Sequence, residues 1–226
     1  RTTTYEQLDT RASQVAQGLI AMGVKPGDRV AHLGKNSDLY LELLLGAAKA
    51  GAVMTPVNWR LAPREFAYII NDSEAKVLFV GPEFTAAVEG LAEPLRVGEI
   101  VGMEAPFKGR AFVEWRDAQP TRDPQILIKR DSAGVQLYTS GTTGNPKGAV
   151  LTHRNLVGMP QASKTYPWSR WSADDVSLFA MPCFHIGGTG WAILGLMHGA
   201  FNVIARELVP TKVLDFIANW RITKLF

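Results

Sequence analysis

Residues 138–148, Tyr-Thr-Ser-Gly-Thr-Thr-Gly-Asn-Pro-Lys-Gly, constrain the fold of this chain more than any other segment. They stand between two apolar runs, residues 135–138 and 149–151, and each run favours a β-strand. Gly141 and Gly144 permit backbone with positive φ, as tight turns often require. The segment therefore predicts a strand that leads into a glycine-rich loop, followed by a second strand that returns.

The loop also carries groups that bind phosphate. Ser140, Thr142 and Thr143 bring hydroxyl groups, and the glycines leave backbone N–H groups accessible to a ligand. Lys147 adds one positive charge. Hydroxyl and N–H donors around a single cation indicate a site for a polyphosphate.

Two other phosphate-binding patterns do not fit. A Walker A loop ends in Gly-Lys-Ser/Thr and opens a helix. Here Pro146 precedes Lys147, Gly148 follows it, and the next residues favour a strand. A dinucleotide fingerprint needs Gly-x-Gly-x-x-Gly, which the loop also lacks. A plain surface hairpin is the remaining alternative, and it suits a short glycine–threonine run better than this whole segment.

Three blocks resemble the adenylate-forming superfamily, which includes acyl-CoA synthetases, aryl-CoA ligases, luciferases and adenylation domains of peptide synthetases. Residues 138–156 resemble its phosphate loop and the segment that follows it. Residues 181–188, Met-Pro-Cys-Phe-His-Ile-Gly-Gly, are similar to its Pro-x-Phe-His motif near the acyl pocket. Residues 48–58 resemble, more weakly, its upstream helix-to-strand segment. The blocks follow the family's order over nearly the whole chain.

This resemblance implies a fold and an activity. The fold is α/β, with part of an acetyl-CoA-synthetase-like large N-terminal domain and helix-covered, mostly parallel sheets in subdomains. The activity is ATP-dependent activation of a carboxylic acid to an acyl-adenylate, with release of pyrophosphate, and then transfer to CoA by an acid–thiol ligase. Residues 57–61 and 184–188 look more like fatty-acyl or aryl CoA ligases than peptide-synthetase domains. The particular acid stays open.

The resemblance also implies roles for individual residues. Lys147 and His185 are the expected catalytic residues, and the hydroxyl of Thr139 is the expected loop ligand for Mg²⁺, which prefers oxygen. The residues expected to hold the phosphates of ATP are Thr139, Ser140, Gly141, Thr142, Thr143, Gly144 and Lys147. The residues expected to border the carboxylic acid are Phe184, His185, Gly187, Gly188 and Thr189.

Several of these residues have structural alternatives. Cys183 and His185 stand two apart, so on a strand they would share a face and could form a nucleophilic pair. A small buried thiol explains Cys183 more simply. Trp191 suits a pocket wall and a core aromatic equally well. His153 falls in a segment that resembles a helix start beside the loop, and we expect it to be structural.

The bulk properties set the remaining expectations. The chain has 226 residues, of which 46% are hydrophobic and 20% charged, as in an ordinary globular protein. A net charge of +3 fits anionic substrates, and scattered basic residues give no reason to expect a nucleic-acid partner. One cysteine and no signal peptide suggest a cytoplasmic protein. The expected partners are the acid, ATP and CoA, with peripheral membrane contact if the acyl chain is long; the oligomeric state stays open.

Helix and strand signals alternate along the chain, which favours a mostly parallel sheet with helical cover. The first helix should begin at Thr4, or at Thr3 with Glu6 as a capping box, and end near Gly23. Asn36 or Ser37 should cap the second helix. Further strands are expected at residues 29–33, 53–57, 76–80, 176–180, 201–205 and 222–226, and further helices at residues 65–71, 84–91, 155–162, 188–198 and 211–219.

We expect three regions: a first α/β subdomain over about residues 1–100, an irregular connection over 101–133, and a phosphate-loop and acyl-pocket subdomain over 134–226. The superfamily's later motifs do not occur, including its adenine-binding block and the small C-terminal domain with a catalytic lysine. The chain is therefore expected to be part of a longer ligase and inactive alone. A non-catalytic nucleotide- or acyl-binding module is the alternative, and a phosphate-loop NTPase is disfavoured by the missing Gly-Lys-Ser/Thr.

Overall fold

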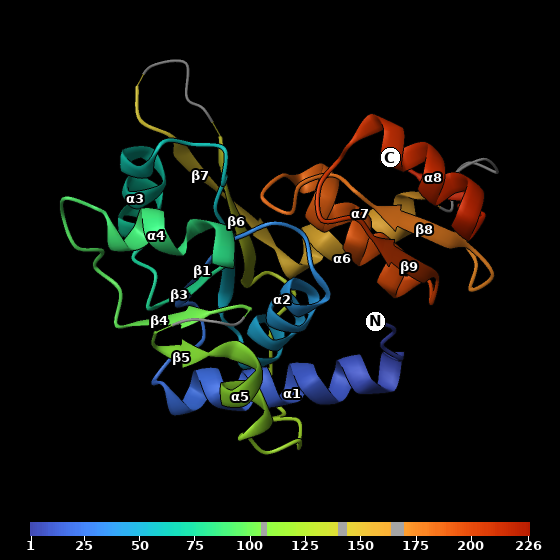
Figure 1. The fold of residues 1–226 in the computed structure, drawn as a ribbon. Coiled ribbons are helices and arrows are strands. Elements are labelled where there is room, and N and C mark those ends of the chain that lie inside the picture. Colours follow the sequence, from blue (N-terminus) through green and yellow to red (C-terminus); the bar gives the residue numbers. More distant parts are fainter. Residues whose placement is uncertain (105–107, 140–143, 164–169) are drawn as a thin grey trace. The chain divides into compact units, whose positions relative to one another are not determined.

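The computed structural model of the chain describes residues 1–104, 108–139, 144–163 and 170–226, and the side chains of all of these except 159–163 (Figure 1). The chain divides into two compact units. The first contains Arg1–Gly34 and Asp38–Thr152, and the second contains Lys35–Ser37 and His153–Phe226. Each unit is described by itself.

The first unit is built on one sheet. Its strands are β1 Arg29–Leu33, β2 Val53–Pro56, β3 Val77–Val80, β4 Glu99–Gly102, β5 Arg110–Ala111, β6 Ala133–Thr139 and β7 Lys147–Thr152. Within the described residues they form a seven-stranded sheet in the order β5-β4-β3-β1-β2-β6-β7. All neighbouring pairs are parallel except β6 and β7, which are antiparallel. The predicted hairpin around the glycine-rich loop is therefore confirmed, and it forms one edge of this sheet.

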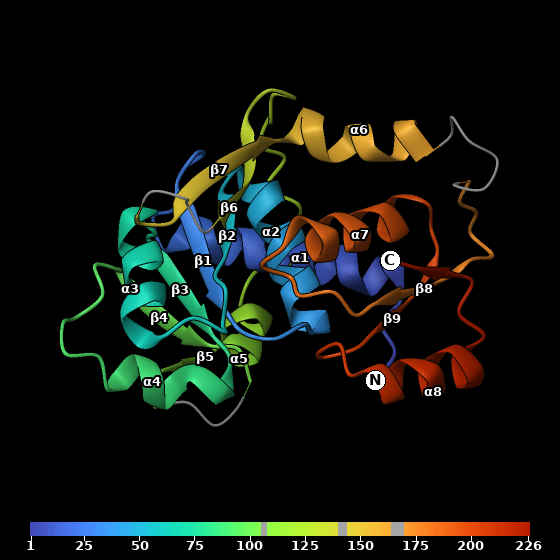
Figure 2. The same ribbon diagram turned by 90° about the horizontal axis from the view of Figure 1, so that it is seen from above.

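Helices cover both faces of this sheet. They are α1 Tyr5–Ala21, α2 Asp38–Ala50, α3 Pro63–Asp72, η1 Pro82–Phe84, α4 Thr85–Glu89 and α5 Phe112–Asp117. α1 packs against α2 and α5, and Figure 2 shows these three helices on one side of the strands, with α3 and α4 on the other. The chain moves from β1 to β2 in one direction and from β2 to β3 in the other, so right-handed crossovers put α2 and α3 on opposite faces.

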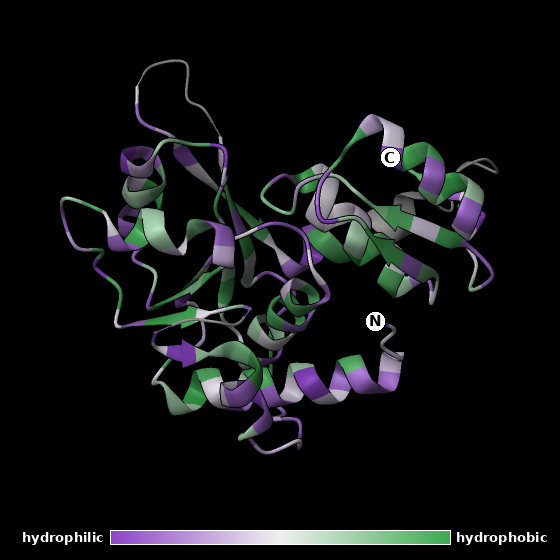
Figure 3. Ribbon diagram, in the orientation of Figure 1, coloured by the Kyte–Doolittle hydropathy of each residue, from purple (hydrophilic) through white to green (hydrophobic). Residues whose placement is uncertain are grey.

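Burial explains why the central strands are apolar throughout. On β1, Ala31 and Leu33 pack in a core with Phe66, Ile69 and neighbouring side chains of α3 and β3. His32 lies on the other face of β1, where its ring is 4.9 Å from the ring of Tyr40 on α2. A strand buried on both faces needs a continuous apolar run, not alternation. In contrast, hydrophilic and hydrophobic residues alternate along the ribbon of α1, as expected of a helix with one buried stripe (Figure 3).

The helix ends follow the expected local rules with two refinements. Thr4 caps α1 as predicted, with Gln7 as its capping-box partner, so the alternative of Thr3 with Glu6 is wrong. Gly23 has a φ of 82°, as predicted for the residue after the helix. The alternative that Asn36 caps α2 is wrong, because its side-chain amide bonds residues far away in the sequence.

The second unit is a small sheet between helices. Its elements are α6 His153–Ser163, β8 Val176–Phe179, α7 Ile186–Met197, β9 Phe201–Ile204, α8 Pro210–Trp220 and β10 Lys224–Leu225. The described strands are parallel in the order β10-β8-β9. Figure 2 shows α7 and α8 on opposite sides of β8 and β9. Val213 and Phe216 of α8 pack on a core that includes Leu178 and Val203.

Two expectations differ from the structure. We expected residues 134–226 to form one subdomain, but β6 and β7 belong to the first unit, because Val135 pairs with Met54 of β2. We also expected Cys183 and His185 to share a strand face. β8 ends at Phe179, and both residues lie in a turn before α7, with Cys183 buried and His185 exposed. Among the described helices, none is both long and apolar enough to cross a membrane.

Candidate phosphate-loop and acid-binding sites

The base of the glycine-rich loop holds Thr139 and Lys147 opposite each other. They are paired residues on β6 and β7, so their side chains lie on the same face of the hairpin, and both are exposed. Gly144 has a φ of 132°, a value that favours glycine, as predicted. Ser140, Gly141, Thr142 and Thr143 lie outside the described residues. The described part of the loop thus presents a hydroxyl and a cation side by side.

The other face of the hairpin carries a chain of polar contacts to α3. The Tyr138 hydroxyl donates to Asp72 Oδ2 at 2.6 Å, and the Tyr68 hydroxyl donates to Asp72 Oδ1 at 3.2 Å. Gln136 Nε2 donates to the Tyr138 hydroxyl at 3.1 Å, and Arg29 Nε donates to Gln136 Oε1 at 3.0 Å. The Asp72 carboxylate therefore accepts hydrogen bonds from both tyrosine hydroxyls, and the bond from Tyr138 anchors the strand that leads into the loop.

The electrostatics agree with this arrangement. Burial raises the pKa of Tyr138, and the hydrogen bond and negative charge of Asp72 raise it further. Burial and the charge of Asp72 also raise the pKa of Tyr68, against the opposing effect of a hydrogen bond with Asn145. Both hydroxyls thus keep their protons and act as donors. Because Asn145 lies on the returning side of the loop, α3 contacts both limbs of the hairpin.

Gly148 is required for space rather than for flexibility. A Cβ there would meet the Gln136 side chain well inside van der Waals contact and would lie 3.1 Å from Tyr138 Cζ. The glycine that follows Lys147 therefore makes room for the polar pair on the neighbouring strand. From the sequence this residue served only to exclude a Walker A loop, since the close approach comes from cross-strand packing.

Residues 180–185 and the first turn of α7 hold the residues predicted to border the acid. The segment 181–185, called here the 181–185 turn, is followed directly by Ile186 of α7. Phe184 is half-buried and His185 is exposed, whereas Gly187, Gly188 and Thr189 are buried. The structure thus brings these five predicted residues together in the second unit. Phe184 and His185 are at least partly accessible to solvent, and the other three are buried in the first turn of α7.

His185 has a defined ring orientation because it caps α7. Its Nδ1 accepts a hydrogen bond from the Gly187 N–H at 3.0 Å. In the neutral ring an accepting Nδ1 leaves the proton on Nε2. An exposed Nε2–H is a donor that could meet a carboxylate oxygen. A partly buried histidine bonded to a backbone carbonyl oxygen is the structural alternative for His185, and the exposure of the residue does not fit it.

Two residues of α7 hold the 181–185 turn against the helix. The Thr189 hydroxyl, fully buried, donates to the Cys183 carbonyl oxygen at 2.6 Å. A Cβ on Gly188 would lie 2.6 Å from the Met181 carbonyl oxygen and would also collide with Pro182. Gly188 is thus a close-approach glycine, and only a residue without a side chain lets α7 begin here.

Cys183, His153 and Trp191, which the sequence analysis also considered, each lie in a buried or half-buried environment. Burial raises the pKa of the Cys183 thiol to about 12, so the thiol stays protonated and unreactive. Burial lowers the pKa of His153, at the start of α6. The half-buried Trp191 ring lies 4.9 Å from the Trp171 ring and 5.7 Å from the Phe226 ring. These aromatic contacts fit a core role and a pocket wall alike.

The donor set at the loop fits Mg²⁺. The Thr139 hydroxyl is a hard oxygen ligand beside Lys147 at the exposed end of the hairpin. The described residues contain no group of three or more His, Cys, Asp or Glu side chains that could enclose a metal. Mg²⁺ commonly takes only one or two protein oxygens and completes its shell with substrate phosphates and water. A single threonine oxygen is therefore an adequate protein contribution.

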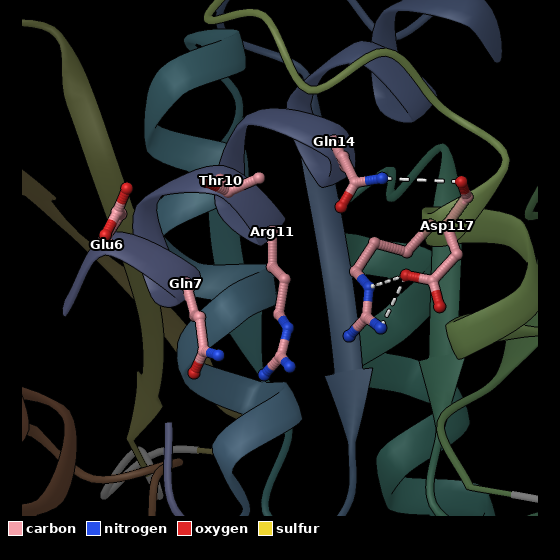
Figure 4. Close-up of a pocket in the computed structure, with 7 residues that line it drawn as sticks. Glu6, Gln7, Thr10, Arg11, Gln14 and Asp117 are labelled. Atoms are coloured by element: carbon pink, nitrogen blue, oxygen red, sulfur yellow. Dashed lines mark hydrogen bonds and ion pairs between the residues drawn. The ribbon is translucent and has the colours of Figure 1, made fainter. Parts of the chain in front are cut away.

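A separate pocket of about 310 Å³ lies between α1 and α5 (Figure 4). Arg11 and Arg116 line it, but both guanidinium groups are already paired with Glu42, and Arg116 also pairs with Asp117. Gln14 donates to backbone carbonyl oxygens of Asp117 and Gln119. With its charges and amide engaged internally, this pocket is part of the ion-pair network of the first unit.

Comparison with known proteins identifies relatives of this chain. A model of the AMP-binding enzyme family matches residues 1–226. A fatty acid–[acyl-carrier-protein] ligase, ScoC of Streptomyces coeruleorubidus, is 40% identical over 227 residues, covering 99% of this chain and 42% of that protein. A feruloyl-CoA synthase of an Amycolatopsis species is 36% identical over 224 residues, covering 99% of this chain and 43% of that protein.

A solved structure is also similar to this chain. The inhibitor-bound N-terminal domain of FACL13 from Mycobacterium tuberculosis matches with a TM-score of 0.86 and 31% identity, over 97% of this chain and 54% of that chain. The chain therefore belongs to the AMP-binding enzyme family, and its fold is that of the N-terminal domains of acyl-CoA ligases. It spans less than half the length of the curated relatives it matches.

Proposed function

We propose that the whole protein activates a fatty or aryl carboxylic acid with ATP and passes the acyl group to CoA. In the first step a carboxylate oxygen attacks the α-phosphorus of ATP, and the bond to pyrophosphate breaks. In the second step the thiol sulfur attacks the acyl carbon, AMP leaves, and the thiol proton passes to solvent or a base. The chain described here contributes the phosphate loop and one wall of the acid site.

The observation that carries this proposal is the pairing of Thr139 with Lys147 at the exposed base of the loop. Two anions must meet in the first step, so neutralising charge is the main requirement. Lys147 would pair with the β- and γ-phosphates, and the loop donors between them would hold the same oxygens. Mg²⁺, when bound, would withdraw charge from the phosphate oxygens, and Thr139 would hold it through its hydroxyl.

His185 and Phe184 are proposed to receive the acid. The ring of His185 is held by its own helix cap, so its Nε2–H keeps a fixed direction without help from the substrate. A carboxylate accepting this hydrogen bond would be oriented for attack, and Phe184 would contact the acyl group. Positioning of this kind can contribute several kcal/mol, and preformed donors add to it.

The acceptor of the acyl group has a second candidate. ScoC is named for transfer to an acyl carrier protein, whereas the feruloyl-CoA synthase is named for CoA. Both acceptors present a thiol, so the first step is the same for each. A carrier-protein thiol is therefore the alternative acceptor in the second step, and a non-catalytic nucleotide-binding module is the alternative to catalysis.

Hydroxamate trapping with the full-length protein tests the proposal. Hydroxylamine captures an acyl-adenylate, so ATP, Mg²⁺ and a panel of fatty and aryl acids should give acid-dependent hydroxamate and pyrophosphate. Replacing hydroxylamine by CoA or by a carrier protein with its thiol arm then identifies the acceptor. ATP binding without hydroxamate or pyrophosphate from any acid in the panel would favour the non-catalytic module.

A further inference from the structure

Asn36 makes an unusual set of contacts in the second unit. It belongs to the short segment Lys35–Ser37, which the chain contributes to this unit between β1 and α2. Its side-chain Nδ2 donates to the Met181 carbonyl oxygen at 2.9 Å and to the Ala205 carbonyl oxygen at 3.1 Å. Its Oδ1 accepts from the Cys183 N–H at 2.9 Å. Asn36 is 2% exposed.

These contacts join the 181–185 turn to the end of β9. Met181 and Cys183 belong to the turn, and Ala205 directly follows β9. The backbone N–H of Asn36 also donates to the Arg206 carbonyl oxygen at 3.2 Å, which holds the asparagine itself in place. Both amide hydrogens and the amide oxygen are thus used, each toward a backbone group of a residue outside the strands and helices.

We propose that Asn36 is a positioning residue for the acid site, and this rests on the proposed function of His185. By fixing the backbone at Met181 and Cys183, the amide determines the position of the last two residues of the turn, Phe184 and His185. The Thr189 hydroxyl, which binds the Cys183 carbonyl oxygen, holds the same peptide from the side of α7. Cys183 is therefore gripped at both its N–H and its carbonyl oxygen.

Only asparagine satisfies this site. Aspartate has the same shape but no donor, so its carboxylate would face two carbonyl oxygens. Leucine fills a similar volume but leaves one buried N–H and two buried carbonyl oxygens without these partners, which is costly in a buried site. If the turn were misplaced, the acid would be poorly aligned for reaction, whereas the phosphate site, which is formed by other residues, would be little affected.

The test measures KM for the acid and KM for ATP separately in the full-length protein. Asn36→Leu should raise KM for the acid by roughly tenfold or more, because several hydrogen bonds that align the turn are lost, and should leave KM for ATP within about twofold. Thr189→Val should shift KM for the acid in the same direction by less, since it removes a single bond to Cys183. If Asn36→Leu does not fold, Asn36→Asp gives the same comparison with an isosteric side chain.

Val203→Ala is the matched control. Val203 lies in the core of the same unit and has no bond to the turn, so its truncation should lower thermal stability with both KM values nearly unchanged. If Asn36→Leu raised both KM values equally, or neither, Asn36 would be a general structural residue and the inference would be wrong.

A second readout needs no activity. Amide hydrogen exchange at Cys183 should become at least about tenfold faster in Asn36→Leu, because its hydrogen-bond acceptor is gone, and should stay protected in Val203→Ala. Unchanged exchange in Asn36→Leu would also overturn the inference. If the wild-type protein formed no acyl-adenylate, the proposed function would fail, and the exchange data would still decide whether Asn36 holds the turn.

Discussion

Lys147 is the residue on which the proposed chemistry most directly depends. It is exposed and pairs across the hairpin with Thr139, so removing its side chain creates no cavity. Lys147→Ala should therefore lower the rate of acyl-adenylate formation by roughly a hundredfold or more, since one preorganised charge is lost, with little change in thermal stability. Acid-dependent pyrophosphate release measures this effect.

The exposed Lys25, in the turn before β1 of the same unit, supplies a charge control for that experiment. Lys25→Ala removes the same positive charge away from the loop and should leave pyrophosphate release near the wild-type rate. Equal losses in the two variants would mean that net charge, not the position of Lys147, is responsible.

Cys183 gives a pH-dependent prediction at the same scale. Its folded pKa of about 12 lies above the ordinary thiol value of about 8.5. Between these two pH values the thiol loses its proton in the unfolded chain but keeps it in the folded chain. The contribution of the protonated thiol to stability is therefore complete below about pH 8.5 and is lost as the pH rises toward 12. From about pH 8 to pH 10 the loss from this thiol should be about 2 kcal/mol.

Urea unfolding of the wild-type protein and of Cys183→Ala at both pH values measures this contribution. The alanine variant should lose less stability than the wild type over that range. The raised pKa of Tyr138 acts in both proteins and cancels in the difference. Parallel pH profiles would show that the thiol is not shielded in the folded state.

The contact between α3 and the loop hairpin belongs to the scale of elements. Tyr138 on β6 and Asp72 at the end of α3 form its shortest hydrogen bond, at 2.6 Å. Asp72→Ala should release the strand that enters the loop and raise KM for ATP about five- to tenfold, as expected for a lost hydrogen bond to a charged group. KM for the acid should stay nearly constant.

Tyr68→Phe and Tyr138→Phe separate the two hydrogen bonds to Asp72. Because Tyr138 continues directly into the loop, Tyr138→Phe should resemble Asp72→Ala, whereas Tyr68→Phe should have a smaller effect. A double-mutant cycle between Asp72 and Tyr138 should give a coupling energy of about 1 kcal/mol or more. Zero coupling would count against the proposed anchoring of the loop by α3.

At the scale of the whole first unit, Glu42 links α2 to α1, to α5 and to the N-terminal residue. It is fully buried on α2 and pairs with Arg116 of α5, Arg11 of α1 and Arg1. Glu42→Ala would leave Arg116, which is 4% exposed, without one of its carboxylate partners. The free energy of unfolding should fall by about 3–5 kcal/mol, as for other broken buried pairs.

The exposed pair of Glu99 and Arg110 in the same unit is the comparison. Glu99→Ala should cost less than about 1 kcal/mol, because solvent screens an exposed pair. Chemical denaturation of both variants measures the difference. Similar losses for Glu42 and Glu99 would contradict the central role assigned to the buried carboxylate.

Much of the fold could be predicted from the sequence because its signals are local. The strands expected at residues 29–33, 53–57 and 76–80 are confirmed as β1, β2 and β3, and the helix expected at residues 65–71 is confirmed as part of α3. The antiparallel pairing of β6 with β7 followed from the glycines between them in the sequence and from the apolar runs on each side. Each of these depends on residues only a few positions apart, so the sequence pattern was sufficient.

The positions that the sequence misjudged depend on distant partners. Asn36 has the local pattern of a helix cap, yet its amide binds Met181, Cys183 and Ala205. These partners follow it in the sequence by 145, 147 and 169 positions. Asp72 is an ordinary residue at a helix end until folding brings Tyr138, 66 positions away, within hydrogen-bond distance. No periodicity or motif encodes such pairs.

The sequence alone thus determined the alternating α/β architecture, the glycine-rich hairpin and the family, because these follow from short-range patterning and from a specific run of residues. Only the tertiary structure decided which groups hold the loop and the 181–185 turn. Those contacts form between backbone and side chains brought together by the packing of separate elements, and the free energy of burying polar groups selects them only once the surrounding interior exists.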